Sequence, residues 1–175
     1  GQFGVSFDDS GRFVTCRESA ALHMDLIPAE YIGRNRHLAQ VTARGGRGTS
    51  GVGVNVAPDG QHVYPIRVTP AITLGARELR EDGRLRTYTI ASGACFYDGD
   101  QYPQDAYGNV FVPESGGHLI GRLRLTPGIR PNATRFYPAE QEFLASTDER
   151  FRPVNARVGP DGALYVADLY RGIIE

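Results

Sequence analysis

A short turn motif recurs along this chain at nearly equal intervals, and it limits the fold more than any other feature. Each copy leads through a polar turn with a glycine into an alternating strand, as in "VSFDDSGRFVTC" and "ARVGPDGALYVADL". The turn glycines are Gly11, Gly60, Gly108 and Gly162, separated by 49, 48 and 54 residues. Aspartate and proline favour the bend, and glycine accepts the positive φ that other residues resist. The motif therefore predicts a series of hairpins.

The interval between the hairpins suits one four-stranded blade of a β-propeller, which takes roughly 40 to 50 residues. Helical periodicity is scarce, and 22 glycines and 11 prolines punctuate the chain, which is typical of short strands joined by tight turns. We expect an all-β fold, about three blades of a propeller. The second copy lies after the glycine-rich stretch 45–60, which is equally consistent with a long surface loop. One helical turn is expected within residues 29–40.

Composition excludes several classes of function. The net charge is −1, so nothing indicates an electrostatic interaction with nucleic acid or anionic lipid. No apolar run reaches the roughly 18 residues of a membrane span. All 19 basic residues are arginine, which excludes a Schiff base or a general base formed by lysine. Cys16 and Cys95 form no haem-attachment or zinc motif; two buried thiols are favoured over a disulfide, which would require an oxidising compartment.

Two arginines near the C-terminal hairpin, Arg150 and Arg152, are the first candidate site. On a strand their alternation would place both side chains on one face, where two guanidinium groups could bind a ligand rich in carboxylates. The alternative is an edge strand whose arginines form weak surface ion pairs with acidic neighbours, namely Asp148, Glu149 or Glu142. Spacing alone favours the ion pairs.

Two further segments carry candidate residues. In "VPESGGHLIGRLRL", Gly116 and Gly117 would allow a close approach of a ligand or a neighbouring backbone, and His118 could act as a base or a ligand. On an alternating strand, however, His118 would lie on a mixed face, which favours a structural role. The stretch 97–105 holds three aspartates that could bind Ca²⁺, although it lacks the EF-hand spacing and a turn is favoured: Asp98, Asp100 and Asp105.

Three segments of the chain, residues 1–16, 92–125 and 142–175, resemble the membrane-bound-type dehydrogenases of planctomycetes and their relatives. That family is similar to the soluble glucose and sorbosone dehydrogenases, which are six-bladed propellers that use pyrroloquinoline quinone (PQQ) and calcium. In those enzymes an Arg-x-Arg before the hairpin contacts the quinone carboxylates. The resemblance implies that Arg150 and Arg152 are cofactor-binding residues.

The chain also departs from this family. The quinone-binding lysine of the preceding blade corresponds to Gly116, and the chain has no lysine. The catalytic base and the calcium ligands of the family belong to earlier blades, so the resemblance assigns no catalytic residue here. We expect residues 1–175 to be the C-terminal part of a propeller whose remaining blades lie in a longer chain. Relatives often append a c-type haem domain, and no haem motif occurs in this sequence.

The leading expectation is thus part of an exported, periplasmic or extracellular bacterial oxidoreductase that acts on a sugar or another alcohol or aldehyde. A c-type cytochrome is the expected electron acceptor. The alternative is a non-catalytic propeller, a binding or assembly module that has lost the quinone site; the missing lysine favours it. A third, weaker hypothesis is a calcium-dependent lactonase-type propeller with four local candidates for metal ligands: Asp98, Asp100, Asn155 and Asp168.

Overall fold

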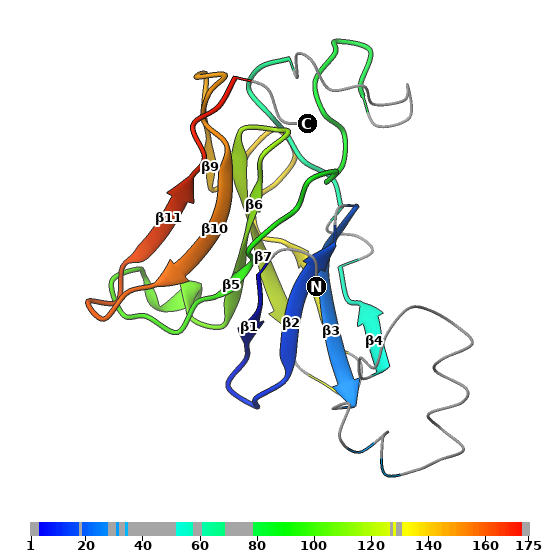
Figure 1. Ribbon diagram of the computed structural model, residues 1–175, viewed down its shortest axis with the longest axis vertical. Coiled ribbons are helices and arrows are strands. Elements are labelled where there is room, and N and C mark those ends of the chain that lie inside the picture. The colour runs from blue at the N-terminus through cyan, green and yellow to red at the C-terminus, as the bar shows by residue number, and fades with distance from the viewer. Residues whose placement is uncertain are drawn as a thin grey trace.

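The computed structural model describes residues 4–17, 19–27, 31, 34, 52–57, 61–68, 79–126, 128 and 131–172. In this part of the chain the fold is all-β, with three antiparallel sheets, none closed on itself, and one short 3₁₀ helix (Figure 1). No helix among these residues is long and apolar enough to cross a membrane. The predicted all-β class is confirmed at this level. The predicted helical turn at 29–40 lies outside the described residues, apart from Tyr31 and Arg34.

The first sheet has four strands in sequence order: β1 (Ser6–Phe7), β2 (Phe13–Arg17), β3 (Ala20–Ile27) and β4 (Val52–Asn55). The β1–β2 turn depends on Asp8, whose carboxylate accepts hydrogen bonds from the backbone N–H groups of Ser10 and Arg12 at 3.0 and 2.8 Å. Gly11 completes the turn with a φ of 73°. A polar side chain that bonds to the nearby backbone, followed by a left-handed glycine, therefore produces the predicted bend.

The second sheet contains β5 (Cys95–Phe96), β6 (Asn109–Glu114), β7 (Leu119–Thr126) and β8 (Asn132–Arg135), again in sequence order. The 3₁₀ helix η1 (Gln104–Ala106) lies in the β5–β6 connection. A short strand, β9 (Leu144–Ala145), pairs with the start of β7, while β8 pairs with its end. The third sheet consists of β10 (Pro153–Val158) and β11 (Leu164–Asp168). Gly108 and Gly162 precede β6 and β11 with φ values of 75° and 78°.

Three of the four predicted hairpins are confirmed, because each positive-φ glycine lies between the first two strands of a sheet. Gly60 lies outside the described residues. The strand before it, β4, pairs with β3 as the last strand of the first sheet. In the described residues that follow, His62 forms only an isolated bridge with Thr87. The second copy of the motif therefore does not begin a new sheet within the described part of the chain.

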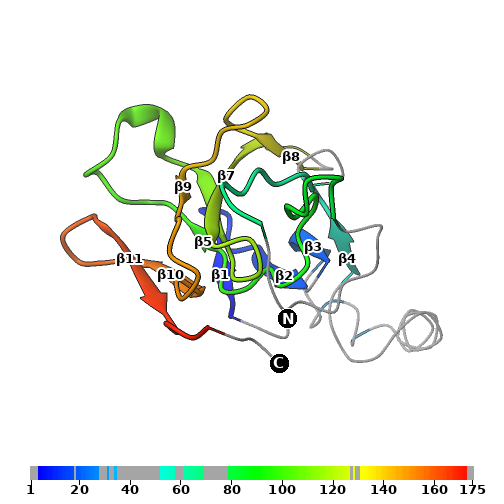
Figure 2. The same cartoon turned by 90° about the horizontal axis from the view of Figure 1, so that it is seen from above.

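The second sheet lies between the other two (Figures 1 and 2), and β1 and β10 both contact β5. Strand alternation gives it two buried faces. Val110 and Val112 of β6 point into a core shared with Val14 and Leu22 of the first sheet. Between them, Phe111 points into a second core, which the third sheet covers. This double burial holds the β6–β7 turn in a fixed position at one end of the sheet.

The third sheet confirms one part of the predicted pattern and corrects another. The alternation of "GALYVADLY" predicts Leu164 and Val166 on one face and Tyr165 on the other, with both faces largely covered. Leu164 and Val166 of β11 do pack against the second core. The opposite face was expected to be covered as well, but Tyr165 is 57% exposed. Ala167 and Asp168 of the same strand are exposed as well, so this part of the expected packing is wrong.

Candidate functional site

The turn between β6 and β7 buries several polar groups. Glu114 is completely buried, and its carboxylate accepts hydrogen bonds from the backbone N–H groups of Thr89, Ile90 and Gly116 at 3.0–3.2 Å. Burial raises the pKa of Glu114 to about 7, although the three N–H donors act in the opposite direction. The carboxyl group therefore changes its charge near neutral pH.

His118 closes the same turn in a left-handed conformation, with a φ of 56°. Its side chain is fully buried. Nδ1 donates to the carbonyl oxygen of Phe151 at 3.0 Å, and Nε2 lies 3.5 Å from Nη1 of Arg152. Burial, and then the charge of Arg152, lower the pKa of His118 to about 4. The imidazole is thus neutral, with Nε2 as an acceptor. The expected strand position of His118 is wrong, because β7 begins at Leu119.

Arg152 is 1% exposed and lies behind this turn. Its guanidinium donates to three backbone carbonyl oxygens, those of Ser115 at 2.9 Å, Gly172 at 2.8 Å and Arg171 at 3.1 Å. Burial lowers its pKa, and the charge of Arg67 acts in the same direction. Arg152 therefore connects the β6–β7 turn to the C-terminal segment.

Arg150 has a different environment. It lies in a turn before β10 and is exposed; its backbone N–H donates to Asp148 Oδ1 at 2.9 Å. The expected placement of Arg150 and Arg152 on one strand face is therefore wrong, because neither residue belongs to a strand and only one is buried. The side-chain ion pairs expected for Arg150 are also absent from the described residues. Glu149 pairs with Arg67 instead, and Glu142 pairs with Arg135.

A surface depression of about 420 Å³ lies beside Arg150. Its other lining residues are Glu149, Tyr170, Arg171 and Gly172. Arg150 and Arg171 both line it, and a guanidinium binds a carboxylate through paired N–H groups. Arg152 does not fit such a role in this conformation, because backbone carbonyls occupy its donors. Of the two arginines that the resemblance assigns to the quinone, only Arg150 is therefore accessible.

The acidic candidates for calcium are dispersed. Asp98, Asp100 and Asp105 are all exposed, and Asp105 lies 3.4 Å from Arg122. In the described ranges, no three His, Cys, Asp or Glu side chains gather as a metal site would require.

The four ligands considered for a lactonase-type site do not converge either. Asp100 lies beside Gly162 at one end of β11. Asp168 lies at the other end of β11, and a strand of this length spans about 13 Å. Its carboxylate accepts hydrogen bonds from the backbone N–H groups of Arg152 and Tyr170. One ion cannot bind both carboxylates.

The two cysteines are buried free thiols, as expected. Cys16 Sγ accepts the N–H of Ala94 at 3.3 Å. Burial raises the pKa of both Cys16 and Cys95 to about 11. These thiols are therefore protonated and unreactive at neutral pH.

Two residues were not predicted from the sequence: Glu114 in the β6–β7 turn and Arg171 at the depression beside Arg150. A signal for Glu114 was present, because it is the one charged residue in the otherwise apolar and polar-neutral run "NVFVPES", and a carboxyl group in a buried strand requires several donors. No local signal identifies Arg171, since its position depends on how the C-terminal segment folds back.

The comparison with known families gives one match, which extends over residues 1–175 and is described as "Domain of unknown function (DUF7133)". The chain belongs to the DUF7133 family. No curated protein and no solved structure matches this DUF7133 domain. A role for the DUF7133 domain must therefore be argued from its own residues.

Proposed function

We propose that this DUF7133 domain is the C-terminal part of a six-bladed, quinoprotein-like β-propeller, with about three blades in residues 1–175. The whole protein would be an exported oxidoreductase that removes hydride from a sugar or another alcohol or aldehyde. The observation that carries the proposal is the depression beside Arg150, which a second arginine, Arg171, also lines. Two sheets with strands in sequence order, together with a third sheet of two strands, support the propeller.

In this proposal the two arginines of the motif have different roles. Arg150, at the depression, binds a carboxylate of the quinone. Arg152 is a positioning residue that fixes the backbone of Arg171 and Gly172, which also line the depression. When bound, PQQ supplies the two-electron chemistry. The base, the calcium ligands and the contact with a c-type cytochrome belong to parts of the protein outside this chain.

The test is a PQQ titration of the full-length protein with Ca²⁺, followed by dye reduction over a panel of sugars and alcohols. We expect PQQ binding that weakens roughly tenfold in Arg150→Ala and in Arg171→Ala, as befits a lost charged hydrogen bond. Arg86→Ala is the matched control, since Arg86 is an exposed arginine outside the depression. Absence of PQQ binding and of dye reduction would refute the proposal.

A second candidate function is a non-catalytic propeller that serves as a binding or assembly module. The specific observation in its favour is that all three nitrogen atoms of the Arg152 guanidinium already donate to backbone carbonyls. A quinone site with Arg152 as a direct ligand would require the C-terminal segment to move. PQQ titration distinguishes the two functions: no measurable affinity, and no difference between the wild type and Arg150→Ala, would support the module.

A further inference from the structure

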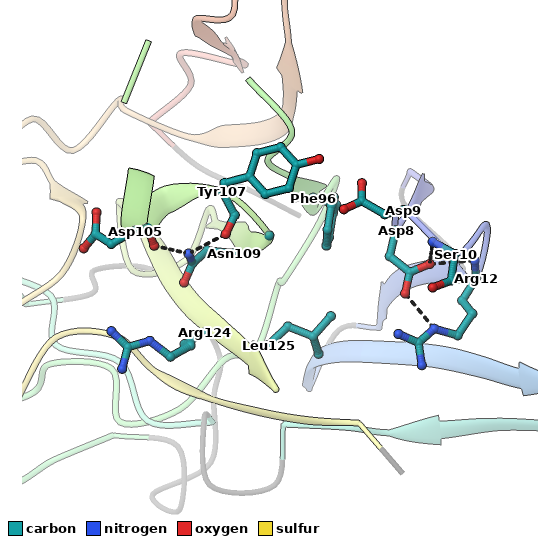
Figure 3. Close-up of a pocket in the computed structure, with 11 residues that line it drawn as sticks. Asp8, Asp9, Ser10, Arg12, Phe96, Asp105, Tyr107, Asn109, Arg124 and Leu125 are labelled. Carbon is teal, nitrogen blue, oxygen red and sulfur yellow. Dashed lines mark hydrogen bonds and ion pairs between the residues drawn. The ribbon is translucent and has the colours of Figure 1, made fainter. Parts of the chain in front are cut away.

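A second depression, of about 460 Å³, lies between the β1–β2 turn and the η1–β6 segment. It is distant from the Arg150 depression, because the segment after β11, which lines that depression, lies towards the top of the view and the β1–β2 turn lies towards the bottom (Figure 1). Its rim carries Asp9, Tyr107 and Arg124, and Phe96 and Leu125 form an apolar floor (Figure 3).

The amide of Asn109 contributes a hydrogen-bond acceptor to this depression. Its Nδ2 donates to the carbonyl oxygens of Asp105 and Tyr107 at 2.5 and 3.4 Å, which fixes the orientation of the amide because a flipped group would place oxygen against oxygen. Oδ1 is directed towards the side on which Arg124 and Leu125 lie (Figure 3). Asn109 is 3% exposed, and no described residue donates to Oδ1. A buried acceptor without a donor is destabilising, so a ligand hydroxyl at this point would be favourable.

The charges around the depression are balanced. Arg12 Nε binds Asp8 Oδ2 at 2.6 Å, so these two neutralise one another. Asp105, which also lines the depression, lies 3.4 Å from Arg122.

On the rim, the carboxylate of Asp9 lies beside the Tyr107 hydroxyl, whose pKa it raises, and keeps further acceptor positions. The guanidinium of Arg124 lies over the Phe136 ring, 4.9 Å from its centroid, a contact that does not use its N–H groups. A phosphate would be repelled by Asp9, and a metal cation by Arg124. A neutral ligand that both donates and accepts hydrogen bonds satisfies the two groups at once.

The floor adds apolar contact. Gly108, with its positive φ, has no side chain over the Phe96 ring, and a Cβ there would lie 3.9 Å from Phe96 Cζ. The ring edge therefore remains accessible from the depression. Apolar area beneath a few convergent polar groups is typical of small-molecule sites, and the C–H face of a sugar ring packs well on such a floor.

We propose that this depression binds a neutral saccharide, whose hydroxyl groups donate to Asp9 and Asn109 Oδ1 and accept from Arg124. The site is separate from the Arg150 depression and does not depend on the function proposed for it.

The experiment is isothermal titration of the full-length protein with glucose, galactose, xylose, maltose, cellobiose and lactose. We expect at least one of them to bind with a dissociation constant on the order of 1 mM. Asp9→Ala and Arg124→Ala should each weaken that binding roughly tenfold, because each removes a charged hydrogen-bond partner. Both residues are exposed, so the variants retain the fold, which circular dichroism verifies. Glu81→Ala and Arg86→Ala, exposed residues outside the depression, should bind as the wild type does.

Three results would overturn the inference. The first is that none of the six saccharides binds. The second is binding that Asp9→Ala and Arg124→Ala leave unchanged, or that Arg150→Ala abolishes, since the sugar would then lie elsewhere. The third is displacement of the sugar by inorganic phosphate or by Ca²⁺, which would identify an ion site instead.

Discussion

Nη1 of Arg152 lies 3.5 Å from Nε2 of His118, where both side chains are buried. The contact is favourable only while the imidazole is neutral, because a protonated Nε2 would bring two positive charges together. Nδ1 carries the proton, as its bond to the Phe151 carbonyl oxygen requires. The structural role of Arg152 and the protonation state of His118 are therefore linked, and the first two predictions follow from this link.

Replacement of Arg152 by Met should destabilise the fold strongly. The change leaves the buried carbonyl oxygen of Ser115 without this donor, removes the hydrogen bonds to the carbonyl oxygens of the exposed Arg171 and Gly172, and deletes a fully buried side chain. We expect a loss on the order of 3 kcal/mol or more in the free energy of unfolding, measured by urea denaturation. Arg150→Met is the control, and its exposed position predicts a change within about 0.5 kcal/mol. Equal effects of the two substitutions would contradict this assignment.

His118→Asn should change how stability depends on pH. The pKa of His118 is about 4 in the folded state against a usual 6.5, so protonation of the unfolded chain removes stability as pH falls from 6.5 to 4. Asn does not titrate, and it tolerates the positive φ at this position. Relative to the variant, the wild type should lose about 3 kcal/mol over that interval. Parallel pH profiles from urea denaturation would show that His118 is not held neutral.

Glu114→Gln should change the pH dependence of stability in the direction opposite to that expected for His118→Asn. The pKa of Glu114 is about 7 in the folded state against a usual 4.5, so its contribution to stability is fully present below pH 4.5 and is lost as pH rises through 7. We expect the wild type to lose about 3 kcal/mol relative to the variant between about pH 4 and pH 8. In the wild type the contributions of His118 and Glu114 to the pH dependence of stability have opposite signs and largely cancel. A variant whose profile follows that of the wild type would exclude a neutral, buried Glu114.

The turn glycines provide a matched pair of substitutions. Gly11 and Gly162 have nearly equal φ values, 73° and 78°. A Cβ at Gly11 would meet no atom within 4 Å, whereas one at Gly162 would collide with Asp100 Oδ1 and lie 3.1 Å from the Asp100 backbone nitrogen. Gly11→Ala should cost about 1 kcal/mol from backbone strain alone, and Gly162→Ala roughly 1–3 kcal/mol more from overpacking. Thermal denaturation of both variants measures the difference, and equal losses would mean that Asp100 moves aside freely.

The sequence by itself determined the all-β class and three of the hairpins. Gly11, Gly108 and Gly162 were identified correctly because a positive φ is a local requirement that glycine meets better than other residues. The alternation also placed Leu164 and Val166 of β11 on one face, since the period of a strand is local. It did not identify which face is buried, because both faces were expected to be covered and Tyr165 on the other face is exposed.

Only the tertiary structure separated Arg150 from Arg152. Alternation predicted one shared face, but the chain turns at Asp148 and the strand begins at Pro153. The burial of Arg152 depends on carbonyl groups 37, 19 and 20 residues away in sequence. The depression at Asn109 likewise requires the β1–β2 turn, which is distant in sequence. Such sites could not be predicted from local pattern, because burial and hydrogen-bond partners are set by how distant segments pack together.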